Sequence, residues 1–190
     1  MKRLFLAVLF LTFCATAFAG ESQLQKATNV INEIMGTPDK AIPDELLERA
    51  VCVGIVPSQL KFALGLGGTY GRGVLVCRKG GNGAWDAPSM FTLGAASIGF
   101  QIGGKATDVV FLVMNPEGMK KLVQDSVKLG AELSAAAGPV GRSAEGATDA
   151  QLHAEILSYS RTRGLFAGAS LDGAVLKQDR DRPRELRSDS

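Results

Sequence analysis

The segment 91–114 limits most strongly what this chain can fold into. It reads FTLGAASIGFQIGGKATDVVFLVM, and only Lys105 and Asp108 add charge to its apolar and small residues. Each of its glycines would cost about 1 kcal/mol relative to alanine inside a helix, and its last residues are β-branched and aromatic. A membrane-spanning helix is a poor interpretation, because the glycines and both charges would lie in hydrocarbon. We therefore predict two strands, at 91–102 and 108–114, joined by a turn at 103–106.

The rest of the chain alternates short apolar segments with glycine-rich ones. Glycines between residues 65 and 73 indicate twisted or bulged strands, and Pro57 is predicted to end the strand before them. Because the elements lack regular βαβ alternation, we predict an α+β fold in a single domain. Its sheet is expected to be largely antiparallel, curved and glycine-rich, with a few short helices. The predicted helices are 21–35, 43–50 and 115–128, and the further strands are 51–56, 60–69, 70–78, 130–137, 153–161 and 165–176.

The first predicted helix is amphipathic. Its apolar residues recur at helical spacing, so they share one face. Such a helix can dock on its own domain or lie on a membrane surface. We expect docking, because the polar face carries a single lysine, Lys26. The face predicted to be buried consists of Leu24, Ala27, Ile31, Ile34 and Met35.

Residues 1–19 have the features of a secretory signal peptide. Two basic residues precede a short apolar segment, and Ala17-Phe18-Ala19 is a cleavage motif before Gly20. We therefore expect a periplasmic or secreted protein, and the compact signal peptide suggests a bacterial one. The bulky Phe13 argues against lipidation of Cys14. The expected parts are the signal peptide at 1–19, one domain at 20–176 and a flexible charged tail at 177–190.

Charge and cysteine content limit which partners and which compartment are expected. Without residues 1–19 the chain keeps 21 − 2 = 19 basic residues against 19 acidic ones. It therefore lacks the net positive charge that is typical of nucleic-acid-binding proteins. Cys52 and Cys77 are expected in an oxidising compartment. A disulfide between them would close a loop of roughly 25 residues and stabilise by about 3 kcal/mol; two buried free thiols are the alternative. We expect no metal and no cofactor, because two cysteines and one distant histidine do not make a zinc site.

Catalytic motifs are incomplete. Residues 99–107 come close to a phosphate-binding loop, but Ala106 follows Lys105 where a hydroxyl residue is needed. Ser97 lies in a motif similar to a nucleophile elbow, and His153, with Glu155 or Asp149 beside it, is the only histidine available. We therefore predict a protein that is not an enzyme.

Several basic residues stand beside glycine-rich turns or strand edges. If they share one end of the sheet, they would form a site for phosphate head groups, because glycines let backbone N–H groups approach. Ordinary solvated charges are the alternative, and sequence alone leaves both open. These residues are Lys61, Arg72, Arg78, Lys79, Lys105 and Arg142.

Segments over about residues 24–176 follow one another in a familiar order. In that order the chain resembles the SYLF family, and the resemblance implies binding of anionic lipids, phosphoinositides in eukaryotic members, without catalysis. Some fungal relatives also bind actin. The matching segments are Pro43-x-x-Leu46-Leu47, Val53-Gly-Ile-Val-Pro57, Gly65-Leu-Gly-Gly-Thr-Tyr-Gly-Arg-Gly-Val-Leu-Val76, Trp85-x-Ala87-Pro88, Gly99-Phe-Gln-Ile-Gly-Gly-Lys-Ala-Thr-Asp108, Val110-Phe-Leu-Val-Met-Asn115, Ala136-Ala-Gly-Pro-Val-Gly-Arg142, Ser158-Tyr-Ser-Arg161 and Gly164-Leu-Phe-Ala-Gly-Ala-Ser-Leu171.

Two function hypotheses follow. In the first, the exported domain binds anionic phospholipid head groups at a membrane surface through Lys61, Arg72, Lys105 and Arg142, and apolar residues of the first helix assist. In the second, it is a structural or interaction domain of the cell envelope that binds a protein partner through its sheet edges, without lipid specificity.

Overall fold

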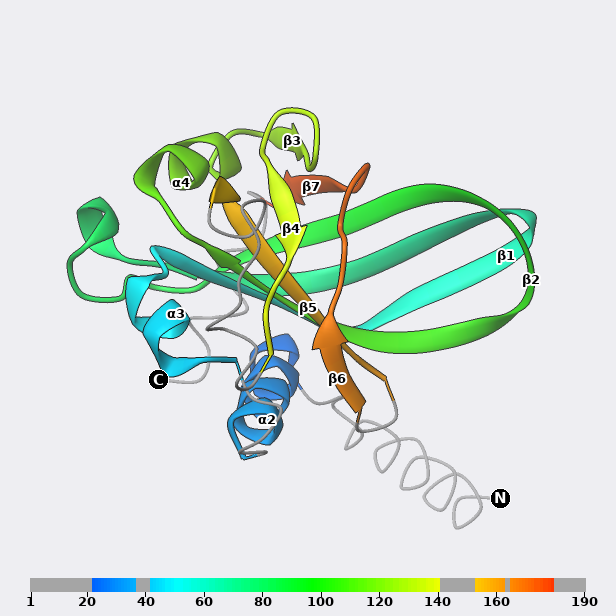
Figure 1. Cartoon of the computed structure of the whole chain (residues 1–190), viewed down its shortest axis with the longest axis horizontal. Helices are drawn as coiled ribbons and strands as arrows, with labels where there is room; N and C mark the ends of the chain where they lie inside the picture. Colours follow the sequence, from blue (N-terminus) through cyan, green and yellow to red (C-terminus); the bar gives the residue numbers. More distant parts are fainter. Residues whose placement is uncertain (1–21, 37–41, 141–152, 163–164, 180–190) are drawn as a thin grey trace, which may run out of the picture.

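A computed structural model describes residues 22–36, 42–140, 153–162 and 165–179 (Figure 1). Within these ranges, side chains are described except at 62–66, 97–105, 162 and 165–166. The predicted signal peptide and Arg142 lie outside the described residues.

The predicted fold class is confirmed: the domain is α+β with a curved, largely antiparallel sheet. Its strands follow the order β3-β7-β2-β5-β4, with β1 paired to β2 and β6 paired to β5. Among the described strands, only β4 and β5 pair in parallel. The helices are α2 (Gln23–Met35), α3 (Asp44–Arg49) and α4 (Pro116–Leu122), with a 3-10 turn η2 (Lys79–Gly81). The strands are β1 (Cys52–Cys77), β2 (Ser89–Val113), β3 (Ser126–Lys128), β4 (Ala135–Ala137), β5 (Ile156–Thr162), β6 (Leu165–Gly168) and β7 (Val175–Gln178).

Strands β1 and β2 form one long antiparallel pair, which we call the ribbon. Its register runs from Cys52 opposite Val113 to Leu75 opposite Ser89. Figure 1 shows that the ribbon leaves the rest of the sheet, bends and returns beside itself. We call residues 58–72 of β1, on the part of the ribbon that bends, the ribbon end.

The predicted breaks within the ribbon are wrong. Each predicted half of β2 pairs with β1 rather than with the other half, so residues 103–106 continue the strand instead of forming a hairpin turn. Pro57 does not end a strand either. It lies with Ser58 in a bulge opposite Asp108, where proline removes no required ladder hydrogen bond.

Two glycines let the ribbon fold back on itself. The ring of Phe111 occupies the space that a Cβ at Gly54 would need, and the ring of Phe91 does the same at Gly73. In each case the glycine and the phenylalanine are directly opposite in the register. The two rings then meet edge to face, with centroids 5.5 Å apart. This contact lies in the main core, which includes Leu75, Leu93, Val109, Leu122 and Leu176.

Helix α2 docks on the sheet, as predicted. Ser22 caps its first turn by accepting a hydrogen bond from the Gln25 N–H at 3.1 Å. The helix buries Val30 and Ile34 in a second core with Val110, Leu112 and Tyr159. The predicted buried face is partly wrong. Ala27, Val30 and Ile34 are buried, whereas Leu24 and Met35 are exposed.

Other boundaries differ from the prediction for local reasons. Helix α4 begins with the Asn115 side chain accepting a hydrogen bond from the Gly118 N–H at 2.7 Å. It ends at Leu122, well before Lys128, because Ser126–Lys128 form strand β3 and pair with β7. The predicted strand 165–176 is two strands, separated by a turn with Gly173 at φ 79°. Lys177 and Gln178, predicted to start the flexible tail, pair with Thr92 and Phe91 instead.

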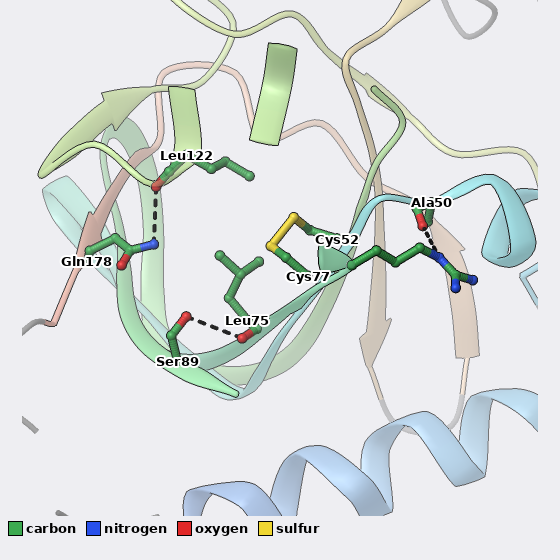
Figure 2. Close-up of a disulfide and its surroundings, with 8 residues drawn as sticks. Ala50, Cys52, Leu75, Cys77, Ser89, Leu122 and Gln178 are labelled. Atoms are coloured by element: carbon green, nitrogen blue, oxygen red, sulfur yellow. Dashed lines mark hydrogen bonds between the residues drawn. A yellow bond between two sulfur atoms is a disulfide. The ribbon is translucent and has the colours of Figure 1, made fainter. Parts of the chain in front are cut away.

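The two ends of β1 are joined covalently. Figure 2 shows the bond between the Sγ atoms of Cys52 and Cys77, beside Leu75 of the core. A Ser89 Oγ to Leu75 O hydrogen bond of 3.3 Å closes the same end of the ribbon. The disulfide therefore links the strand where it leaves the sheet to the point where it returns.

A partly buried ionic contact holds α4 to the sheet. The Glu155 carboxylate accepts hydrogen bonds from Lys121 Nζ at 2.9 Å, from the Ser134 N–H at 3.0 Å and from Ser134 Oγ at 3.2 Å. Burial by itself raises the pKa of Glu155, but these hydrogen bonds and the positive charge of Lys121 together lower that pKa below its ordinary value. The ionised carboxylate is thus the stabilising form.

We predict that Gly73→Ala destabilises the protein by about 3 kcal/mol through overpacking. Its Cβ would meet the Phe91 ring and lie 2.6 Å from the Ile55 carbonyl oxygen. Gly94→Ala, on the paired strand, is the matched control, because its nearest contact is 3.6 Å away. It should change stability by less than about 1 kcal/mol. Urea unfolding measures both, and equal effects would contradict the fold-back contact.

We predict that Glu155→Gln lowers the unfolding free energy at pH 7 by about 1.5 kcal/mol, because partly buried hydrogen bonds to a charged carboxylate are lost. Since the native pKa is lowered, this stability is present above the unfolded pKa of about 4.3 and is lost as pH falls through the native pKa. The gap between variant and wild type should therefore narrow at acidic pH.

The control is Glu117→Gln, which removes an exposed ion pair with Lys120. It should change stability by less than about 0.5 kcal/mol. A Glu155→Gln deficit that stays constant from pH 7 to acid would contradict the assignment of the ionised form.

Candidate functional site

The ribbon carries a local excess of positive charge. Strands β1 and β2 contain three basic residues, Lys61, Arg72 and Lys105, and one acidic residue, Asp108. The near-neutral total of the chain hides this excess, and a charge count over short windows of the sequence would have found it. Arg78 and Lys79 lie in the segment between the two strands, which also holds Asp86.

The register brings two of the predicted site residues together. Lys61 is exposed on β1, and Lys105 holds the position directly opposite it on β2. Directly opposite positions of an antiparallel pair belong to the same face of a sheet. Lys61 forms no ion pair with any side chain that the structure describes.

Arg72 is a weaker member of the site than predicted. Its Nη2 lies 3.5 Å from Asp179 Oδ2, so part of its charge is compensated. Its carbonyl oxygen accepts a 2.6 Å hydrogen bond from Gln23 Nε2 of α2. Arg78 does not contribute to this site, because it makes contacts elsewhere. Its Nε donates to the Ala50 carbonyl at 3.1 Å, and its guanidinium carbon lies 4.2 Å from the Trp85 ring centroid.

Two exposed apolar side chains lie at the ribbon end and were not predicted as site residues. Leu60 is 56% exposed and Tyr70 is 51% exposed. We call the parts of β1 before and after the bend its two limbs. A Cβ at Gly71 would touch Val56 and lie 3.2 Å from the Gln59 Cα, so the two limbs are in contact there. Leu60 and Tyr70 are the chain neighbours of Gln59 and Gly71. Because Gln59 and Gly71 are buried, strand alternation turns Leu60 and Tyr70 outward.

An ionic network fixes the base of the ribbon end. Ser58 adopts φ 53° in the bulge, and its N–H donates to Asp108 Oδ1 at 2.8 Å. Arg161 donates to Asp108 Oδ2 from Nη2 at 2.7 Å and from Nε at 3.0 Å, and it also pairs with Glu33 of α2. The Asp108 carboxylate is therefore paired with Arg161, and among the described ion pairs none involves Lys61.

The candidate nucleophile and base are not brought together. Ser97 pairs with Gly67 near the bend of the ribbon, whereas His153 precedes β5, whose first residue pairs with Val113 at the other end of the ribbon. Glu155, considered as a partner for His153, binds Lys121 and Ser134.

Among the described residues, no three metal-binding side chains gather in one place. Within the same part of the chain, every helix is too short or too polar to cross a bilayer.

Comparisons with known proteins give one consistent result. A family model described as "Las17-binding protein actin regulator", named Ysc84, matches residues 94–186. The chain is 33% identical over 179 residues to LAS seventeen-binding protein 3 of Saccharomyces cerevisiae, covering 90% of this chain and 38% of the relative. It is 30% identical over 172 residues to human SH3 domain-containing YSC84-like protein 1, covering 87% and 50%. The chain thus spans about two fifths to one half of the length of these relatives.

Proposed function

Because this chain belongs to the Ysc84 (SYLF) family, we propose that it binds anionic phospholipid head groups at a membrane surface and catalyses no reaction. One observation carries the proposal. The ribbon has three basic residues and one acidic residue, Asp108, and its two lysines, Lys61 and Lys105, are directly opposite each other.

The charge arrangement of the ribbon end suits a phosphate-rich surface. Like charges at directly opposite positions of an antiparallel pair repel each other, and a phosphate group between them would remove that repulsion. Exposed backbone at glycine-rich strands can approach the same phosphate. The nearest described acid along β2, Asp108, is held by Arg161 and does not compete. Arg72 contributes less, because Asp179 compensates it.

Helix α2 can assist at the same surface. Its first turn is tied to the ribbon through the hydrogen bond from Gln23 to the Arg72 carbonyl. Leu24, which follows directly, is exposed. An apolar side chain beside basic ones is the combination that interfacial binding uses.

We propose that the protein acts outside the cytoplasm, in a periplasm or secreted, after cleavage near Ala19-Gly20. The signal features of residues 1–19 support this location. The disulfide between Cys52 and Cys77 adds support, because such bonds persist in oxidising compartments.

Protein binding is the second candidate function. The observation that favours it is the similarity to proteins named for protein binding. The matching family is described as a Las17-binding protein and actin regulator, and the yeast relative is named a LAS seventeen-binding protein. For this chain, actin filaments are therefore a direct test of a protein partner without lipid specificity.

We predict that the chain sediments with vesicles containing phosphatidylglycerol but not with pure phosphatidylcholine vesicles, and that binding weakens as salt rises. Lys61→Gln and Lys105→Gln should each weaken binding about fivefold, because a basic residue near an anionic surface contributes about 1 kcal/mol. Lys120→Gln is the matched control. It removes an exposed lysine from α4, which lies outside the ribbon, and should leave binding unchanged.

Equal losses for all three variants would show that only total charge matters and would remove Lys61 and Lys105 from the site. Sedimentation with actin filaments but with neither kind of vesicle would contradict lipid binding and favour the protein partner.

We predict that peptide mapping without reductant recovers Cys52 linked to Cys77. Reduction should lower the unfolding free energy by about 3 kcal/mol, because a loop of 25 residues opens in the unfolded chain. The double variant Cys52→Ala with Cys77→Ala should be insensitive to reductant. Two alkylatable thiols in protein purified without reductant would contradict both the bond and the support it gives to export.

A further inference from the structure

We propose that the ribbon end is the part of the molecule that enters a bilayer, with Leu60 and Tyr70 inserted below the phosphate level and Lys61 held at that level. This inference rests on the proposed function. It adds an orientation, with the ribbon end toward the membrane and the loop that carries Trp85 away from it.

Leu60 and Tyr70 are assigned to the membrane-inserted part because of their exposure. Among the described large apolar side chains, Leu60 and Tyr70 are the most exposed, at 56% and 51%. They come from the two limbs of β1 on either side of the bend, which contact each other through Gln59 and Gly71, so both side chains flank the same bend; we call this pair the patch. A single exposed apolar residue needs no explanation, but two of them flanking the bend of one projecting element indicate an interaction site.

The chemistry of the patch fits a lipid interface. Tyrosine has an apolar ring with a polar tip, which is why it gathers where hydrocarbon meets head groups. Lysine can keep its charge at the phosphates while its alkyl stem lies deeper. The patch has basic residues near it in the sequence, at 61 and 72, and no acidic residue between 51 and 85. This charge favours an anionic surface, and the tyrosine and leucine beside it favour a bilayer interface as that surface.

The geometry of the ribbon decides the orientation. Figure 1 shows the bend of the ribbon projecting beyond the helices and the other strands. The loop with Trp85 joins β1 to β2 at the opposite end, where Arg78 pairs with Trp85 in an isolated bridge. A flat surface that meets the bend end-on lies away from this loop. The indole there is further engaged with the Arg78 guanidinium.

The single tryptophan of the chain makes a direct test possible. The full chain with native Trp85 is compared with a double variant, Tyr70→Trp in a Trp85→Phe background. Each is mixed with phosphatidylglycerol–phosphatidylcholine vesicles whose acyl chains carry bromine, a quencher of indole fluorescence. The indole at position 70 should shift to shorter wavelength and be quenched. The native indole should keep its spectrum while the protein still sediments with the vesicles.

A substitution gives an independent readout. Leu60→Ser should weaken vesicle binding about tenfold, because a leucine no longer leaves water. Val123→Ser is the matched control, since Val123 is 49% exposed on the C-terminal cap of α4, outside the ribbon. It should leave binding unchanged. Both side chains are exposed, so the two variants should unfold at the same temperature as the parent chain.

The possible outcomes distinguish the orientation, the proposed function and self-association. Sedimentation with quenching of Trp85 and none at position 70 would overturn the orientation and leave the proposed function standing. Failure to sediment with any vesicle would overturn the proposed function itself. A Leu60-dependent increase in molecular mass without vesicles would assign the patch to a second copy of the chain and overturn its insertion into a bilayer.

Discussion

The edge-to-face contact between Phe91 and Phe111 is the interaction on which the rest of the structure depends. Each ring lies over a glycine of the opposite strand, Gly73 or Gly54, in space that a Cβ would otherwise fill. Such ring pairs contribute about 1 kcal/mol beyond the area they bury. Their larger effect is geometric, because they bring the two limbs of a very long strand together. Among the strands that the structure describes, β1 pairs only with β2, so a straight ribbon would leave an exposed edge prone to aggregation. Folding back brings the two limbs of β1 against each other instead.

This arrangement explains why charge and apolar surface gather at one place. The bulge at Ser58 is fixed by Asp108, and Arg161 then neutralises that carboxylate. Beyond this point the ribbon carries Lys61 and Lys105 at directly opposite positions, and Leu60 and Tyr70 face outward from limbs of β1 that are in contact. A chain that is near neutral without residues 1–19 thus presents a basic, partly apolar ribbon end.

Much of the architecture could be predicted, because glycines and β-branched residues exclude helices over the ribbon. The fold-back could not. In the sequence, a glycine that permits a hairpin turn cannot be told from one that makes room for a phenylalanine ring. Only the register shows that Gly103 continues a strand and that Gly73 lies opposite Phe91. Periodicity also failed to separate the buried Val30 from the exposed Leu24, because the partner of α2 is remote in sequence. The site was predicted in part. Lys61 and Lys105 are brought together, but Leu60 and Tyr70 depend on a contact between limbs that no local pattern encodes.

The most direct test of the folded-back ribbon is a distance between spin labels at positions 60 and 70 in the oxidised full chain. Ten residues of continuous extended strand span roughly 33 Å. We predict a distance well below this value, because the two positions lie on limbs in contact. A distribution centred near the extended length would contradict the account, since the two limbs of β1 would then not be in contact and Leu60 and Tyr70 would not flank one bend.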